Sequence, residues 1–129
     1  MLEDHIRLKS INHTTYNVRD KDVALAWYQD ILGLKQIPKM VDSDHLYWLQ
    51  LPSGAMVHII ENPDGPAMPS HHAAFEVDNI EAAREALIAK GVETTDIQVR
   101  HDGQRAFYIN DPDGNRIEIC TQSGFGVLV

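Results

Sequence analysis

The spacing of apolar residues along the chain predicts two helices, each set among short strands. In the first helix, Val23, Trp27 and Ile31 recur on one face. Asp20 stands just before this stretch and is a good N-cap residue, while Gly33 stands where the helix should end. We therefore expect an amphipathic helix between Asp20 and Gly33.

A second stretch with helical spacing begins near Asp78, which we expect to cap it. Glu81 follows three residues later, as in a capping box, and Gly91 marks the end of the helix. The buried stripe that this spacing predicts consists of Ile80, Ala83 and Leu87.

Short runs rich in β-branched and aromatic residues predict strands around both helices. A strand with a histidine precedes each helix, with the sequences INHTTYNV and HHAAFEV. Three more follow each helix, at about 35–41, 45–51 and 55–61, and again at about 94–100, 105–110 and 115–121. The chain thus repeats one β-α-β-β-β module. We predict an α+β fold in which two βαβββ modules, at 9–61 and 70–121, form a single domain over residues 1–129.

Matching turns align the two modules with each other. The last two strands of each module are joined by LPSG at 51–54 and by DPDG at 111–114, and a proline followed by glycine is typical of a tight turn. His58 and Glu118 each follow the turn glycine by four residues, and His13 and His72 stand near the start of each module. The repeat therefore places four possible metal ligands at two pairs of equivalent positions.

The alternation of side chains along strands predicts where these four residues point. In the strands that carry His13, His72 and Glu118, apolar residues favour one face and the candidate ligand lies on the other. The apolar face should pack against a helix, so the ligand face should line a cavity or meet water. The strand of His58 is ambiguous, because both of its faces are otherwise apolar.

Imidazole and carboxylate groups together suit Fe(II), Zn, Mn(II), Ni or Co(II). Two histidines and one carboxylate on one side of a metal leave positions open for substrate and for water or O₂. We expect one divalent metal ion held by His13, His72 and Glu118. For His58 three roles stay open: fourth ligand, catalytic base, or neither.

Charge and composition restrict the partners. Eleven basic residues against nineteen acidic ones give a net charge of -8, which argues against binding to nucleic acid or to an anionic membrane. No apolar run approaches the roughly 20 residues of a membrane span, and the start MLEDHIRLKS does not resemble a secretory signal. The one cysteine, Cys120, allows no internal disulfide. We expect a cytoplasmic protein with a small-molecule partner.

Three segments carry a resemblance to a known group: INHTTYNVRDKDVALAWYQDILGLK, HHAAFEVDNIEAAREALIAKG and FYINDPDGNRIEIC. They resemble the vicinal-oxygen-chelate superfamily, which includes glyoxalase I, the bleomycin and fosfomycin resistance proteins, methylmalonyl-CoA epimerase and the extradiol dioxygenases. The resemblance implies a cupped, partly open mixed β-sheet barrel with its helices outside. It also implies that His13, His72 and Glu118 are metal ligands, and that His58 stands where glyoxalase-like members carry a fourth.

The stretch from Val99 to Glu118 also resembles the signature of the extradiol dioxygenases, with His101, an aromatic pair ending in Tyr108, and then DPDG. That resemblance implies that His101 and Tyr108 contact the substrate or oxygen. Fosfomycin-modifying relatives hold a phosphonate with basic residues, and the segment after Glu118 has none.

These features favour an Fe(II)-dependent, extradiol-type dioxygenase acting on a small catechol-like substrate, with Tyr108, His58 and His101 as its catalytic residues. One alternative is a glyoxalase- or epimerase-type lyase or isomerase that uses a non-redox metal. Another is a non-catalytic protein that sequesters a ligand, as bleomycin resistance proteins do. An uncovered edge strand favours a homodimer, and one module must pair with another either within the chain or across subunits.

Overall fold

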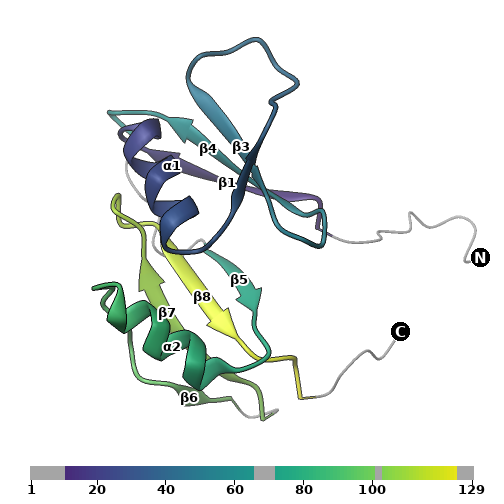
Figure 1. Cartoon of the computed structure of the whole chain (residues 1–129), viewed down its shortest axis with the longest axis vertical. Helices are drawn as coiled ribbons and strands as arrows, with labels where there is room; N and C mark the ends of the chain where they lie inside the picture. Colours follow the sequence, from purple (N-terminus) through teal and green to yellow (C-terminus); the bar gives the residue numbers. More distant parts are fainter. Residues whose placement is uncertain (1–10, 66–71, 101–102, 125–129) are drawn as a thin grey trace, which may run out of the picture.

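The computed structural model describes residues 11–65, 72–100 and 103–124, and the predicted module occurs in it twice (Figure 1). The first module consists of β1 (His13–Val18), α1 (Lys21–Asp30), β2 (Lys35–Ile37), β3 (Leu46–Gln50) and β4 (Met56–Glu61). The second consists of β5 (His72–Glu76), α2 (Ile80–Ala89), β6 (Gln98–Val99), β7 (Arg105–Asn110) and β8 (Arg116–Cys120). The predicted α+β fold with two βαβββ modules is confirmed.

Both modules fold into a four-stranded mixed sheet with the same topology. The strand orders are β1-β4-β3-β2 and β5-β8-β7-β6. In each sheet only the first pair is parallel, β1 with β4 and β5 with β8. Thr15 lies opposite His58 in one pair and Ala74 lies opposite Glu118 in the other. His58 and Glu118 therefore occupy equivalent places, and the histidine-bearing strands β1 and β5 both lie at a sheet edge.

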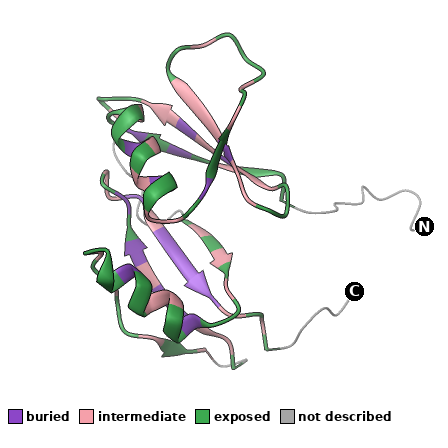
Figure 2. Ribbon diagram, in the orientation of Figure 1, coloured by how far each residue is buried: buried purple, intermediate pink, exposed green. Residues whose placement is uncertain are grey.

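One face of each sheet packs on its helix and forms the core. Tyr16 of β1 and Val57 and Ile59 of β4 are buried on that face in the first module. Ile117 and Ile119 are buried in the second, where β8 is covered along most of its length (Figure 2). The burial pattern of β4 shows which of its two faces packs on the helix: the buried residues lie on the face opposite His58.

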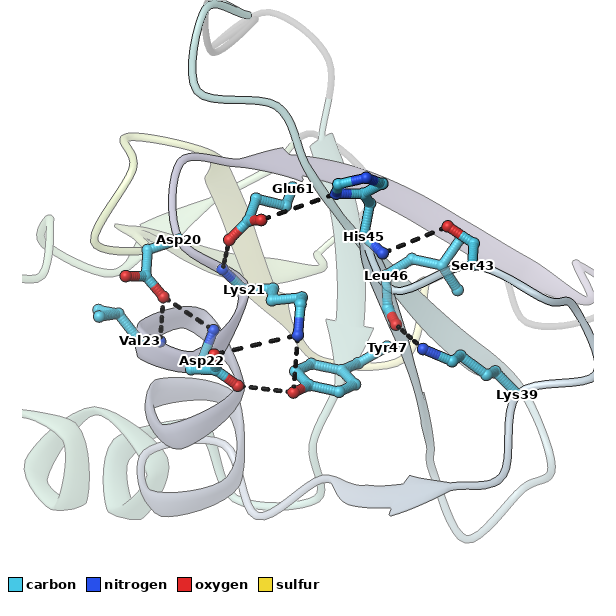
Figure 3. Close-up of polar contacts among 10 residues, drawn as sticks. All are labelled: Asp20, Lys21, Asp22, Val23, Lys39, Ser43, His45, Leu46, Tyr47 and Glu61. Atoms are coloured by element: carbon cyan, nitrogen blue, oxygen red, sulfur yellow. Dashed lines mark hydrogen bonds and ion pairs between the residues drawn. The ribbon is translucent and has the colours of Figure 1, made fainter.

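Polar contacts attach the start of α1 to its own sheet (Figure 3). Asp20 caps the helix, as predicted, and its carboxylate accepts from the backbone N–H groups of the second and third residues that follow. The Lys21 backbone N–H donates to Glu61 of β4, and its ammonium donates to the Tyr47 hydroxyl of β3. Tyr47 in turn donates to Asp22. The helix therefore starts at a position that two strands of the sheet determine.

The buried face of α1 differs from the predicted one. Val23 is 54% exposed, whereas Ala24 and Tyr28 are fully buried. Trp27 and Ile31 pack at the margin of the core. The buried face of α1 is therefore shifted by one residue from the predicted one. Ala24 and Tyr28, which are four residues apart on one side of the helix, are the residues that face the sheets.

The prediction that Asp78 caps α2 is wrong. Asn79, and not Asp78, is the N-cap, and its side-chain oxygen accepts from the Ala82 N–H. The carboxylate of Glu81 pairs with Arg105 of β7, so no capping box forms. The residues of α2 that are buried are Ile80 and Leu87. No helix within the described ranges is long and apolar enough to cross a membrane.

Two strands are shorter than their sequences predict. β2 stops at Ile37, before Pro38, because proline lacks the N–H that a sheet ladder needs. β6 contains only Gln98 and Val99. Before it, Thr95 bonds both backbone groups of Tyr108, one through its N–H and the other through its hydroxyl. The Thr95 hydroxyl thus accepts a hydrogen bond that a backbone carbonyl would accept in the longer predicted strand.

The DPDG turn between β7 and β8 also joins the two modules. The buried Asp111 carboxylate accepts a hydrogen bond of 3.0 Å from the hydroxyl of Tyr28 in α1. Asn115 donates to the Asn17 carbonyl at 2.7 Å. The Arg19 backbone N–H donates to the carboxylate two residues beyond Asp111, at 2.8 Å. Burial raises the pKa of Asp111, against the opposing effect of its hydrogen bonds. These contacts fix one module against the other within a chain.

Candidate metal centre

The first module brings His13 and His58 together on the face of its sheet that faces away from the helix. Their rings stack with centroids 4.1 Å apart and planes 17° from parallel. The β1–β4 register explains the contact, because Thr15 lies directly opposite His58 and His13 is its diagonal neighbour. Two imidazoles from adjacent strands therefore form one half of a possible ligand set.

Trp48 fixes the ring of His58 from the other side. It is the direct cross-strand partner on β3, and its ring stacks on the imidazole at 4.4 Å and 3°. The His58 Nε2 is buried and has no hydrogen-bond partner among the described residues. Burial, and after it the neighbouring His13, lowers the pKa of His58. Burial thus favours the neutral ring, and its Nε2 is left without a hydrogen-bond partner in the described part of the chain.

A neighbouring amide can orient the other imidazole. The His13 Nδ1 lies 2.9 Å from the Asn12 Oδ1. Because an amide oxygen only accepts, this contact requires the proton on Nδ1 and leaves the lone pair on Nε2. Such a fixed tautomer is common in histidines that bind metals.

The second module brings His72 and Glu118 together at the equivalent place. The His72 Nε2 lies 3.1 Å from the Glu118 Oε1. Two ligands bound at about 2.1 Å from one ion, at right angles to each other, would be about 3 Å apart. The spacing therefore fits a shared metal ion, and Glu118, with 12% of its side chain exposed, is largely shielded from water.

Tyr108 and two arginines surround this second pair. Tyr108 lies opposite Glu118 on β7, and its ring meets the ring of His72 edge to face, with centroids 5.7 Å apart. Its hydroxyl accepts a hydrogen bond of 2.6 Å from Arg100, whose guanidinium is 3.8 Å from the Glu118 carboxylate. The Arg116 guanidinium lies 4.2 Å above the Tyr108 ring. The second half of the site is therefore polar and cationic, whereas the first is aromatic.

The two pairs do not converge within one chain. His13 and His72 line a common cleft of about 680 Å³ between β1 and β5. Even so, no group of three or more histidine, cysteine or acidic side chains in the described part of the chain is placed to hold a metal. The structure thus contains two half-sites, His13 with His58 and His72 with Glu118.

The donor atoms themselves suit a divalent transition metal. Three imidazoles and one carboxylate are borderline ligands of the kind that Zn, Ni, Co(II), Mn(II) and Fe(II) accept. The unpartnered nitrogen of His58 and the close His72–Glu118 pair are the two observations that fit such an ion. The residues present therefore fit the metal that the sequence predicts.

Other candidates from the sequence have different outcomes. His101 lies outside the described residues. Cys120 is buried and its thiol points to the Phe75 carbonyl at 3.6 Å, as a small core residue. Sequence reasoning missed Trp48, although the repeat that relates His58 to Glu118 also relates Trp48 to Tyr108. It also missed Arg100, which no repeat or motif marks.

The sequence model of the Glyoxalase/Bleomycin resistance protein/Dioxygenase superfamily matches residues 10–119 of the chain. The uncharacterized protein YaeR of Escherichia coli is 31% identical over 126 residues, which cover 89% of this chain and 98% of YaeR. A lactoylglutathione lyase of Haemophilus influenzae is 30% identical over 134 residues, covering 90% of this chain and 98% of the relative.

The fold also resembles solved structures. A glyoxalase family protein from Bacillus anthracis superposes with a TM-score of 0.81 at 27% identity, covering 91% of this chain and 98% of that protein. A structure named oxidase ChaP-H2 superposes with a TM-score of 0.71 at 26% identity, covering 92% of this chain and 99% of that one. The similar proteins thus have names from more than one reaction class.

Proposed function

Because the chain belongs to the glyoxalase/bleomycin resistance protein/dioxygenase superfamily, we propose that it is a metal-dependent enzyme whose centre is shared between two subunits. Members of this superfamily commonly bind divalent metals. The proposed ligands are His13 and His58 of one subunit with His72 and Glu118 of the other. The observation that carries the proposal is the pairing of these donors into two separate half-sites.

The contacts between the modules support an arrangement across subunits. Bringing the two half-sites of one chain together would require one module to move against the other. That motion would break the bond from Tyr28 to the buried Asp111 and the bond from Asn115 to Asn17. Losing a hydrogen bond to a buried charged group costs about 1.5–3 kcal/mol. A second copy can supply the missing donors without this cost, since β1 and β5, which carry His13 and His72, are the edge strands of their sheets.

Four protein ligands favour lyase or isomerase chemistry over oxygen chemistry. The unpartnered Nε2 of His58, held between Trp48 and His13, is better placed as a ligand than as a mobile base. A six-coordinate ion with four such ligands keeps two positions, which a substrate with two adjacent oxygens fills. When bound, the metal would supply Lewis acidity toward those oxygens. The Tyr108 hydroxyl, positioned by Arg100, is available to hold a proton at the substrate.

An extradiol-type dioxygenase is the second candidate, and Tyr108 favours it. Its hydroxyl lies beside Arg100 and its ring touches His72, and the signature around DPDG places a tyrosine at this position in such enzymes. Dioxygenase activity requires that His58 does not bind the metal, so that a third coordination position is left for O₂. The sequence favours this activity, whereas the geometry of His58 shifts our preference to the lyase or isomerase.

Metal-specific turnover separates the candidates. The Zn, Ni and Co(II) forms should turn over a hemithioacetal or a 2-oxo thioester without oxygen uptake. The Fe(II) form, prepared without oxygen, would then be mixed with substituted catechols and air. Oxygen consumption with a yellow ring-cleavage product would overturn the lyase proposal in favour of the dioxygenase. A protein that retains no metal after reconstitution would leave only ligand sequestration.

A further inference from the structure

The second half-site contains more positive charge than its proposed metal ligands need. On this face of the sheet Arg100 and Arg116 flank Tyr108, next to His72 and Glu118. Arg100 lies near the Glu118 carboxylate, at 3.8 Å. Arg116 makes no hydrogen bond or ion pair through its guanidinium to any residue that the structure describes. The Arg116 side chain is half-buried and packs on the Tyr108 ring, and no carboxylate of the described residues pairs with it.

A polar cleft opens beside this guanidinium. Its volume is about 580 Å³. The residues that line it besides glycine are Glu93, Thr94, Thr95, Tyr108, Asn110 and Arg116. Most of these can donate hydrogen bonds. Glu93 is the one carboxylate among them, and no ion pair joins it to Arg116 in the described ranges.

The Arg116 guanidinium packs on the Tyr108 ring and makes no ion pair with a carboxylate of the described residues. Glu93 lines the same cleft but does not pair with this guanidinium, so Arg116 is available to an anion that enters the cleft. A planar guanidinium fork is matched to a carboxylate in two parallel hydrogen bonds. We propose that the substrate has a carboxylate in addition to its two adjacent oxygens, and that Arg116 binds this carboxylate in the polar cleft. This inference rests on the proposed function, because it extends the same site.

The two halves of the shared centre would then recognise different parts of one molecule. Trp48 and Met56 line the half contributed by one subunit, which suits an apolar or unsaturated body. Arg116 and Asn110, in the half contributed by the other, suit the acid. The specificity determinant is therefore Arg116, which lies outside the ligand set.

Binding of a matched pair of chelators tests the proposal. The probes are 3,4-dihydroxybenzoate and its methyl ester, titrated by calorimetry into the Zn form of wild type, Arg116→Gln and Arg105→Gln. Wild type should prefer the acid by at least about tenfold, as expected for one charge-assisted pair. Arg116→Gln should lose that preference and keep its affinity for the ester. Arg105→Gln, which removes an equal charge beside α2, should behave as wild type. Equal affinity for acid and ester in wild type, or a preference that survives in Arg116→Gln, would overturn the proposal.

A metal-free arm separates this inference from the proposed function. Benzoate, which cannot chelate through adjacent oxygens, should shift the NMR signals of wild-type apoprotein and leave those of Arg116→Gln in place. If benzoate binds in this way while the protein fails to hold metal, the carboxylate site stands and the proposed function fails. If the protein holds metal normally but neither probe depends on Arg116, the inference fails and the proposed function stands.

Discussion

Tyr28, in the helix of the first module, donates a hydrogen bond of 3.0 Å to Asp111, in the last turn of the second. Both residues are buried, with Tyr28 fully covered and Asp111 5% exposed. Burial raises the pKa values of both groups. The bond fixes one module against the other within the chain, and it supports the proposal that a second subunit completes the metal centre.

Removing this bond should destabilise the fold. Tyr28→Phe should lower the free energy of unfolding by about 1.5–3 kcal/mol, because the buried Asp111 carboxylate loses a donor. Tyr47→Phe is the matched control, since it deletes a hydroxyl that bonds the exposed Asp22 carboxylate and the Lys21 ammonium at the helix start, and it should cost less than Tyr28→Phe does. Urea denaturation of both variants checks this. Equal losses would show that the Tyr28–Asp111 bond does not hold the modules together.

The metal-free protein should show a histidine that resists protonation. Burial lowers the pKa of His58, so the fold favours the neutral ring. The stability that this ring contributes is full above its unfolded pKa of about 6.5 and is lost as the pH falls through its lower folded pKa. Wild type, freed of metal by a chelator, should therefore lose more stability between about pH 7 and about pH 5 than His58→Gln does. Parallel curves of unfolding free energy against pH would contradict this.

Trp48 should act on the metal through His58. Trp48→Leu removes the ring that stacks on the imidazole at 4.4 Å. Metal affinity should fall by about tenfold or more, as when other groups that orient a ligand are lost. Trp48→Phe keeps an aromatic surface and should restore most of the affinity. Competition with a chromophoric chelator measures both. Wild-type affinity in the leucine variant would mean that the ring of His58 needs no support.

Glu118 and Glu76 are two carboxylates on one face of the second sheet, and only Glu118 is a proposed metal ligand. Glu118 is largely buried beside His72, whereas Glu76 is exposed at the far end of β5. Glu118→Gln should lose most of the bound metal, because a neutral amide is a poor ligand, while Glu76→Gln should keep it. Elemental analysis after reconstitution gives the answer. If both variants retain about one metal per pair of half-sites, the carboxylate is not a ligand.

The repeat in the sequence predicts most of the fold, because its alternating pattern sets which face of each strand is buried. It places His58 and Glu118 at equivalent positions, and the strand registers agree. The local pattern correctly predicts Asp20 as the cap of α1 but misplaces the cap of α2, where Asn79 and not Asp78 has the side chain that accepts from the helical N–H. Arg100 was not predictable, since only the folding of the β6–β7 region brings it to Tyr108. The contact between the modules was not predictable either, since Tyr28 and Asp111, which form it, are far apart in the sequence.

A metal count on hybrid dimers tests the shared centre most directly. One variant carries His13→Ala and His58→Ala, and the other carries His72→Ala and Glu118→Ala, so neither has a complete ligand set alone. The two would be co-refolded with different affinity tags, and the doubly tagged hybrid would be isolated. The shared centre predicts about one metal ion per hybrid dimer and almost none in either parent, because one of the two interfaces regains all four ligands. A hybrid that binds no more metal than its parents, while wild type binds normally, would place the centre within one chain and contradict the account.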